Sequence, residues 1–159
     1  MTPVANAKLP RRSKNRQRLG GDTPKTLNTY EEAMQWLQGH YNLEKNLGSD
    51  EAAPPSLDRM TVLMELLGNP HRDIPAIHIT GTNGKGSTSR MLVELIGATG
   101  LDVGSYTSPH IDRVNDRIMI ANQPLDDESM TRAISEIAEV EQWVIEATGE
   151  PPSYFEILC

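Results

Sequence analysis

Residues 77–88 read IHITGTNGKGST, and this stretch decides how the rest of the chain is interpreted. The apolar, β-branched run at residues 75–80 precedes three glycines and predicts a buried strand. Residues 86–100 follow with apolar side chains at helical spacing and predict a helix. A strand, a glycine loop and a helix in this order are typical of a phosphate-binding loop at the carboxyl end of a parallel strand.

The spacing of this loop differs from the common nucleotide-binding pattern. That pattern has a glycine five residues before the Gly-Lys pair and a serine or threonine directly after the lysine; here Ile79 and Gly86 occupy those positions. The chemistry is retained because glycines let backbone N–H groups turn toward phosphate oxygens, and the helix directs its positive end at the same anion. Lys85 adds a charge for the outer phosphates, and Ser87 or Thr88 supplies a hydroxyl near phosphate or metal.

Periodicity predicts an α/β domain around the loop. Thr29 stands three residues before Glu32, a capping-box spacing that predicts the start of a first helix. Further helices are expected at 57–68 and 127–148, and further strands at 102–107 and 118–121. We therefore expect a P-loop-type parallel sheet flanked by helices.

Composition and charge narrow the class of protein. The single cysteine, Cys159, excludes a disulfide framework and fits the cytoplasm, and the longest apolar runs are too short to span a membrane. Net charge is −7, yet residues 1–28 carry seven Lys/Arg and one acid. This basic segment predicts a disordered, solvated tail. A nucleic-acid contact or an Arg-rich targeting leader is the alternative, but the segment lacks aromatic residues and an amphipathic stripe.

Four ordered segments resemble one enzyme family. The nucleotide loop TGTNGKGS (80–87) is similar to that of folylpolyglutamate synthase, dihydrofolate synthase and the muramyl ligases, and Gly86 resembles the folate branch. Residues 104–118 (GSYTSPHIDRVNDRI) resemble the family's TSPH…NER segment, and residues 151–157 (PPSYFEI) its TxFE segment. SLDRM with LGNP, before the loop, completes the match. The resemblance implies that residues 29–159 form the amino-terminal part of a Mur-ligase-like ATP-binding domain.

The resemblance implies an ATP-dependent ligase of folate metabolism. ATP would phosphorylate the carboxylate of folate or dihydropteroate, and the amino group of L-glutamate would then attack the acyl phosphate. ATP and Mg²⁺ are the implied cofactors, and no nucleic-acid or membrane partner is expected. A full-length member is expected to be a monomer. Whether the first glutamate is added, the tail is extended, or both, stays open.

The resemblance also assigns roles to individual residues. Lys85 is the expected catalytic cation, and Ser108 the expected magnesium ligand, although Ser108 also fits a plain cap before Pro109. The ATP-binding residues are expected to be Thr82, Asn83, Gly84, Lys85, Gly86 and Ser87. The substrate-binding residues are expected to be Ser153, Tyr154, Phe155 and Glu156. This last segment fits equally well a helix start capped by Ser153, with Phe155 in the core.

Arg113 and Arg117 have two interpretations. Their guanidinium groups could approach phosphate or carboxylate, or pair with Asp112 and Asp116 on a solvated loop. His110 is expected to act only through a neighbouring ligand.

Family members continue beyond the matched segment into further metal ligands and a second domain. We therefore expect a fragment that is inactive alone. A muramyl ligase fragment, a small P-loop kinase and a non-catalytic nucleotide-binding fragment are the alternatives. The kinase is disfavoured by the displaced first glycine and the missing Arg-rich lid.

Overall fold

A computed structural model describes residues 25–42 and 57–159 of the chain. Most of the predicted basic tail, residues 1–28, lies outside the described residues. The helices within the described ranges are α1 (Tyr30–Gln38), α2 (Leu57–Leu66), α3 (Lys85–Gly97), α4 (Asp127–Ala138), α5 (Glu141–Thr148) and α6 (Tyr154–Leu158), with short 3₁₀ turns η1 (Pro70–Arg72) and η2 (Val114–Arg117). The strands are β1 (Gly104–Tyr106), β2 (Ile118–Ile120) and β3 (Gln123–Pro124).

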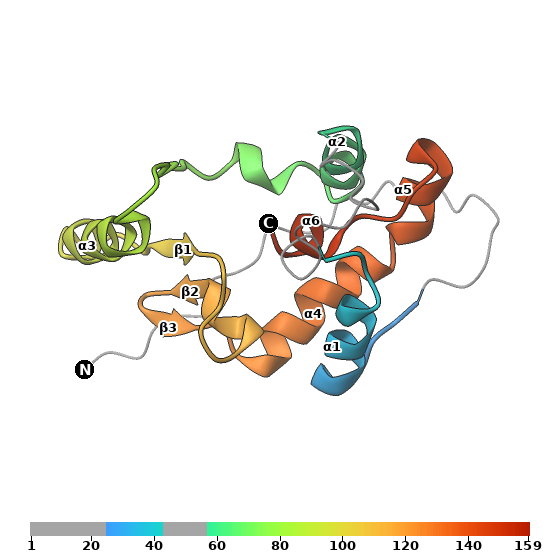
Figure 1. Cartoon of the computed structure of the whole chain (residues 1–159), viewed down its shortest axis with the longest axis horizontal. Coiled ribbons are helices and arrows are strands. Elements are labelled where there is room, and N and C mark those ends of the chain that lie inside the picture. The colour runs from blue at the N-terminus through green and yellow to red at the C-terminus, as the bar shows by residue number, and fades with distance from the viewer. Residues whose placement is uncertain (1–24, 43–56) are drawn as a thin grey trace.

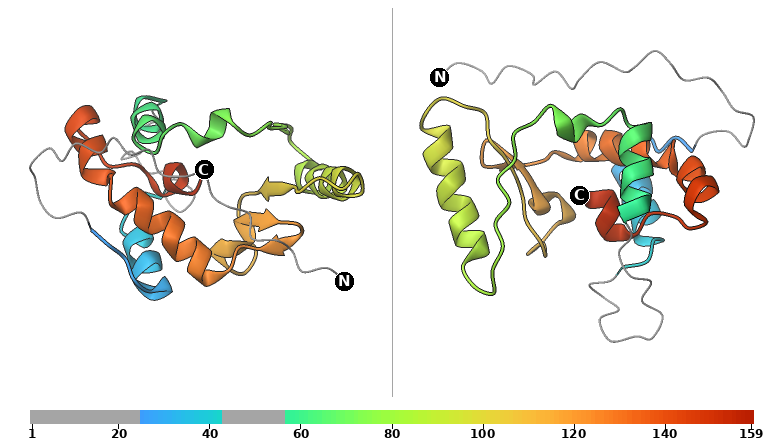
Figure 2. Two further views of the ribbon diagram at one scale, coloured as in Figure 1. Left: turned by 180° about the vertical axis from the view of Figure 1, so that it is seen from behind. Right: turned by 90° about the horizontal axis from the view of Figure 1, so that it is seen from above.

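The elements form two groups (Figure 1). Helix α3 and the three strands lie at one end of the molecule, whereas α1, α2, α5 and α6 gather at the other. Helix α4 runs from the sheet into the helical group, and the segment between α2 and α3 crosses between the two ends (Figure 2). The nucleotide-loop sequence therefore belongs to the end that holds α3 and the sheet.

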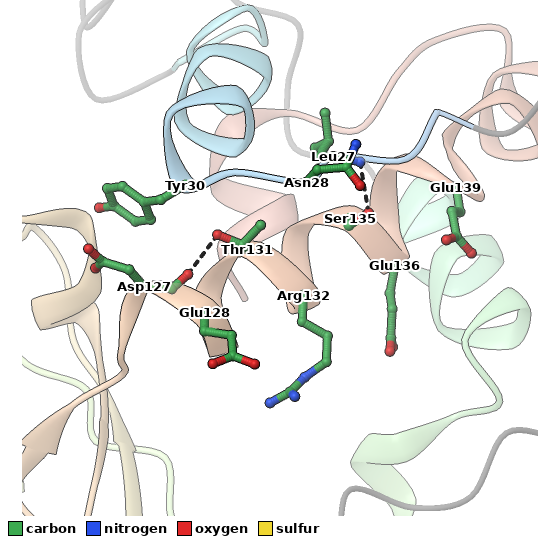
Figure 3. A pocket seen from close by; sticks show the side chains of 10 residues that line it. All are labelled: Leu27, Asn28, Tyr30, Asp127, Glu128, Thr131, Arg132, Ser135, Glu136 and Glu139. Carbon is green, nitrogen blue, oxygen red and sulfur yellow. Dashed lines mark hydrogen bonds between the residues drawn. The ribbon is translucent and has the colours of Figure 1, made fainter.

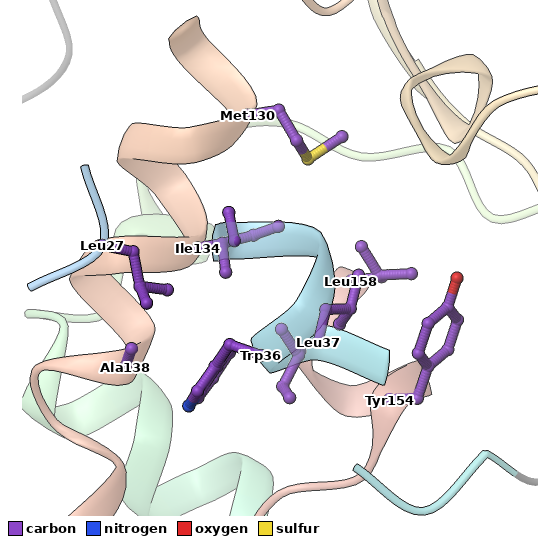
Figure 4. Close-up of a cluster of buried hydrophobic side chains, with 10 residues drawn as sticks. Leu27, Trp36, Leu37, Met130, Ile134, Ala138, Tyr154 and Leu158 are labelled. Atoms are coloured by element: carbon purple, nitrogen blue, oxygen red, sulfur yellow. The ribbon is translucent and has the colours of Figure 1, made fainter. Parts of the chain in front are cut away.

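The main core is built by α1, α4 and α6 (Figure 4). Helix α1 starts as predicted: the Thr29 side chain accepts from the backbone N–H of Glu32, and the Glu32 carboxylate accepts from the backbone N–H of Thr29. This fixes the helix so that Trp36 and Leu37 pack against Ile134 of α4. A capping box of this kind satisfies backbone N–H groups at the helix start, and burial of the apolar face provides most of the stability.

The predicted single helix over 127–148 is wrong: the chain makes two helices there, α4 and α5. Helix α4 is capped by the Asp126 side chain, which accepts from the N–H of Ser129 at 2.6 Å. The break falls at Val140, which is fully buried with Val144 against Leu63 of α2 in a second core cluster. A straight helix would carry these apolar side chains away from α2, so tertiary packing decides the bend.

The strand pairing differs from the prediction. The described sheet has the order β1-β2-β3 and is antiparallel throughout, with Gly104 opposite Ile120 and Tyr106 opposite Ile118. The predicted buried strand at 75–80 is wrong: within the described residues it has no strand partner, and Ile77 is 65% exposed. A strand exists only where another strand satisfies its backbone groups, and no described segment does so here.

Candidate nucleotide-binding site

Two glycines shape the predicted phosphate loop. Gly81 has φ +148° and Gly84 has φ +76°, a conformation that side chains with a Cβ rarely adopt. Gly84 is the N-cap of α3, and no side chain caps this end of the helix. The backbone N–H groups of the first turn are therefore directed out of the helix start, as a phosphate-binding loop requires. The helix begins at Lys85, one residue before the predicted position.

The Lys85 side chain contacts the beginning of the loop. Its Nζ donates to the carbonyl oxygen of Gly81 at 2.5 Å. An ammonium group has three N–H donors, so it can hold this carbonyl and a phosphate oxygen at the same time. The predicted catalytic cation therefore lies at the mouth of the loop.

The other predicted ATP-binding residues surround Lys85. Every residue from 81 to 88 is exposed, which includes Thr82, Asn83, Gly86 and Ser87. No neighbouring atom lies within 4 Å of a Cβ built on Gly84 or Gly86. The loop is thus open to solvent, and its backbone N–H donors are not enclosed in a pocket.

Ser108 lies in the turn after β1. Its side chain is exposed, the Ser108–Pro109 peptide bond is cis, and the hydrogen bonds found among the described residues do not involve its hydroxyl. A hydroxyl is a hard oxygen donor of the kind Mg²⁺ accepts alongside phosphate oxygens and water. The described residues contain no group of three or more His, Cys, Asp or Glu side chains that could hold a metal. A magnesium-ligand role for Ser108 stays a prediction.

Arg117 is fully buried, so its interpretation as a residue of a solvated loop is wrong. Its approach to phosphate or carboxylate stays a prediction. Its Nε donates to Nδ1 of His110 at 3.0 Å. The guanidinium carbon also lies 5.5 Å from the ring centre of Tyr154. The buried Arg117 side chain therefore anchors the turn that carries Ser108 and His110.

Arg113 pairs with Asp127 rather than with Asp112 or Asp116. Its Nη2 donates to Asp127 Oδ1 at 2.6 Å, and its guanidinium lies 5.3 Å from the ring centre of Tyr30. Asp116 instead accepts from the backbone N–H of Arg113 at 2.9 Å. This hydrogen bond lowers the pKa of Asp116, which stays ionised as a cap for the η2 turn.

The predicted substrate segment is a helix start. Ser153 caps α6, accepting from the N–H of Glu156, while the Glu156 carboxylate accepts from the N–H of Ser153 at 2.7 Å. Tyr154 is the core residue of this turn, at 4% exposure, whereas Phe155 is 38% exposed. The cap interpretation is confirmed, but the core side chain is Tyr154 rather than Phe155. The exposed ring of Phe155 is available to stack on a flat heterocycle.

Sequence reasoning missed Arg59 as a structural residue. Arg59 belongs to the SLDRM segment and is buried on α2, where its guanidinium pairs with both oxygens of Glu156 and with Glu150. Burial opposes the ionisation of Glu156, but hydrogen bonds from Arg59 and Ser153 together outweigh it and lower the pKa of Glu156. Arg59 lies four residues before the buried Leu63, so its helical spacing already placed it on the inner face.

A hollow beside α4 does not include the loop. It has a volume of about 630 Å³ and lies between residues 27–30 and α4 (Figure 3). Four acidic side chains line it against one arginine, Arg132. An anionic nucleotide is not favoured there, so the loop geometry, and not the size of a hollow, locates the candidate site.

Comparisons with known proteins point to one family. A dihydrofolate synthase/folylpolyglutamate synthase of Bacillus subtilis is 33% identical over 129 residues, which cover 81% of this chain and 28% of that protein. A structure of a folylpolyglutamate synthase (FPGS) complex with AMPPCP and folate matches with a TM-score of 0.70 and 31% identity, covering 82% of this chain and 30% of that one. Mycobacterium tuberculosis folylpolyglutamate synthase complexed with ADP matches with a TM-score of 0.69 and 31% identity, covering 81% and 27%.

The chain is a relative of the folylpolyglutamate and dihydrofolate synthases. No protein-family model matches it. It spans less than a third of the length of these synthases. The expected α/β class, part of a Mur-ligase-like domain, is confirmed by the synthase structures, although the described strands pair in an antiparallel sheet. No helix in the described ranges has the length and apolar character that a bilayer crossing requires.

Proposed function

We propose that the chain provides the phosphate-binding part of an ATP-dependent ligase that joins L-glutamate to folate or dihydropteroate. The observation that carries this proposal is the loop from Gly81 to Lys85 at the uncapped start of α3. It occurs in a chain that matches solved synthases bound to AMPPCP with folate, or to ADP. Loop geometry supports anion binding, and the relatives support the choice of reaction.

The main requirement of this reaction is to neutralise the negative charges of the carboxylate and the phosphates that come together. A folate carboxylate must approach the γ-phosphate of ATP, become an acyl phosphate, and then be attacked by the glutamate amino group with loss of phosphate. In this proposal Lys85 and the loop N–H groups stabilise the negative charge on the phosphates during transfer; the uncapped start of α3 and the Lys85 contact with Gly81 support it. Bound Mg²⁺ would neutralise phosphate charge as well, and Ser108 is the residue that would donate an oxygen to it.

We further propose that residues 1–159 alone bind nucleotide weakly and do not turn over. The whole loop is exposed, and the hollows beside α4 and beside the end of α3 do not include a loop residue. Electrostatic stabilisation by fixed donors is strong only where water is excluded.

The first experiment is an NMR titration of the ¹⁵N-labelled chain with Mg·AMPPCP. We expect shifts confined to the amides of residues 81–88 and to Ser108, and a large loss of affinity in Lys85→Ala. The matched control is Arg132→Ala, which removes the same charge from α4. Equal effects of the two variants, or shifts centred on the hollow beside α4, would overturn the proposed site.

The second experiment measures phosphate release that depends on ATP, L-glutamate and either folate or dihydropteroate. It compares residues 1–159 with the longest product that the gene encodes. Turnover by the longer product alone would support both proposals. Robust turnover by residues 1–159 would overturn the proposal that they are inactive alone.

A further inference from the structure

Arg117 is the largest fully buried side chain among the described residues. A buried guanidinium loses its hydration and persists only where protein groups replace it. Here the Nε donates to Nδ1 of His110, and the guanidinium carbon lies 5.5 Å from the ring centre of Tyr154. The backbone carbonyl of Arg117 also accepts from the N–H of Thr107, directly after β1. Arg117 therefore connects the turn after β1 with α6.

The contact with His110 determines where the imidazole carries its proton. A guanidinium N–H can only donate, so Nδ1 of His110 must accept with its lone pair. In a neutral imidazole the proton then resides on Nε2. The ring is thereby fixed in one tautomer, with an N–H donor on the edge that faces away from Arg117.

The position of His110 gives this arrangement a consequence for the candidate site. His110 is half-buried and lies two residues after Ser108, whose side chain is exposed. Tyr154, on the other side of Arg117, follows Ser153 in the predicted substrate segment. One buried cation thus ties the predicted magnesium-side turn to the predicted substrate-side helix.

We infer that Arg117 is a positioning residue: it holds His110 as the Nε2–H tautomer and so fixes the Ser108–His110 turn relative to α6. The role of this turn in ATP and magnesium binding rests on the function proposed above. The tautomer and the anchoring of the turn do not.

Arginine is required for this arrangement because its donors lie on a rigid planar fork. A lysine of similar charge ends in a single ammonium group, which cannot direct one donor at the His110 ring while presenting a flat face to Tyr154. Arg117→Lys is therefore the informative variant, since it keeps the charge and removes the geometry.

The deciding experiment is a long-range ¹H–¹⁵N correlation of the imidazole rings in the ¹⁵N-labelled chain, at a pH at which they are neutral. We expect His110 as a single Nε2–H tautomer in the wild type and as a mixture in Arg117→Lys. The matched control is Arg113→Lys, because Arg113 is exposed and pairs with Asp127. This variant should leave the His110 signals unchanged.

Three results would overturn the inference. They are an Nδ1–H form of His110 in the wild type, a tautomer mixture in the wild type, or a pure Nε2–H form in folded Arg117→Lys. The wild-type measurement decides even where the variant fails to fold.

A second measurement separates this inference from the proposed function. The magnesium-dependent part of the AMPPCP affinity should fall roughly tenfold or more in Arg117→Lys, as for other groups that orient a metal ligand, and stay unchanged in Arg113→Lys. An unchanged affinity in folded Arg117→Lys would overturn the positioning role. If the wild type binds no nucleotide, the proposed function fails, and the tautomer measurement still decides how Arg117 holds the turn.

Discussion

Arg59 on α2 and Glu156 on α6 form a buried, bidentate ion pair between residues that are 97 positions apart in the sequence. Arg59 Nε lies 3.0 Å from Glu156 Oε2, and Arg59 Nη2 lies 3.1 Å from Glu156 Oε1. Because Glu156 also caps α6, this pair links the second core cluster to the main core. Both carboxylate oxygens of Glu156 accept hydrogen bonds from protein groups. We therefore propose that Glu156 affects a substrate only by fixing the position of α6.

We expect either single change, Arg59→Met or Glu156→Met, to lower the free energy of unfolding by about 3–5 kcal/mol. Arg59→Met leaves the buried Glu156 carboxylate without its ion-pair partner, and Glu156→Met leaves the buried Arg59 only the exposed Glu150. The double variant should cost less than the sum of the two, because it removes both charges together. Urea unfolding followed by circular dichroism measures all three.

The control for this cycle is the pair of Arg113 and Asp127, whose side chains are 50% and 49% exposed. Arg113→Ala should cost much less stability than Arg59→Met, because water screens such an exposed pair. A loss below about 1 kcal/mol in both Arg59→Met and Glu156→Met would contradict the importance of the buried pair.

Stability should fall on acidification. The pKa of Glu156 is lowered from its ordinary value of 4.5, since the hydrogen bonds from Arg59 and Ser153 together outweigh burial. A lowered pKa in the folded state adds stability that is complete above about pH 4.5 and is lost as pH falls through the lower, folded value. The pKa of Asp126 is lowered too, chiefly by the backbone hydrogen bond from Ser129.

The measurement for this prediction is urea unfolding at a series of pH values from about 7 down to about 3. Glu156→Gln should be less stable near neutral pH and should show a shallower loss of stability in acid. Glu136→Gln, on the exposed surface of α4, should keep the wild-type slope. An identical slope in Glu156→Gln and the wild type would refute the assignment.

The two glycines beside Lys85 should respond in opposite ways to alanine. Gly84 has φ +76°, so Gly84→Ala should destabilise the chain by about 1–2 kcal/mol. Gly86 lies inside α3, and no neighbouring atom lies within 4 Å of an added Cβ, so Gly86→Ala should stabilise the fold by about 0.5–1 kcal/mol.

Despite its added stability, Gly86→Ala should weaken AMPPCP binding, because its methyl group would occupy space that a phosphate needs. Thermal unfolding gives the first quantity and an NMR titration the second. Full affinity in Gly86→Ala would show that the nucleotide does not approach the start of α3.

Ser108→Ala should weaken AMPPCP binding in the presence of magnesium and leave binding in its absence unchanged. The hydroxyl is exposed, so its loss should not change the fold. Calorimetric titrations with Mg²⁺ and with EDTA distinguish the two states. Ser129→Ala, distant in sequence, controls for removal of a hydroxyl, and equal losses with and without magnesium would exclude a metal-ligand role for Ser108.

Local patterns predicted much of this protein. The capping box of Thr29 and Glu32, the glycine-rich loop before α3 and the cap of α6 by Ser153 all depend on residues within a few positions of each other. Their hydrogen bonds form within one turn, so the sequence is sufficient to locate them. The same short segments carried the resemblance to the folate ligases, which the relatives bear out.

Long-range packing decided the rest. The bend at Val140 depends on where Leu63 lies. The Tyr154 ring beside Arg117 and the Glu156 partner of Arg59 come from distant segments, and residues 75–80 find no strand to pair with among the described residues. From the sequence alone a charged side chain is predicted to be exposed. Only the fold shows which protein groups replace its hydration. The sequence by itself therefore determined the glycine loop before α3 and the helix caps, because backbone conformation and capping are local. Only the tertiary structure decided which charges are buried and which helix bends, because burial depends on every element that packs against a residue.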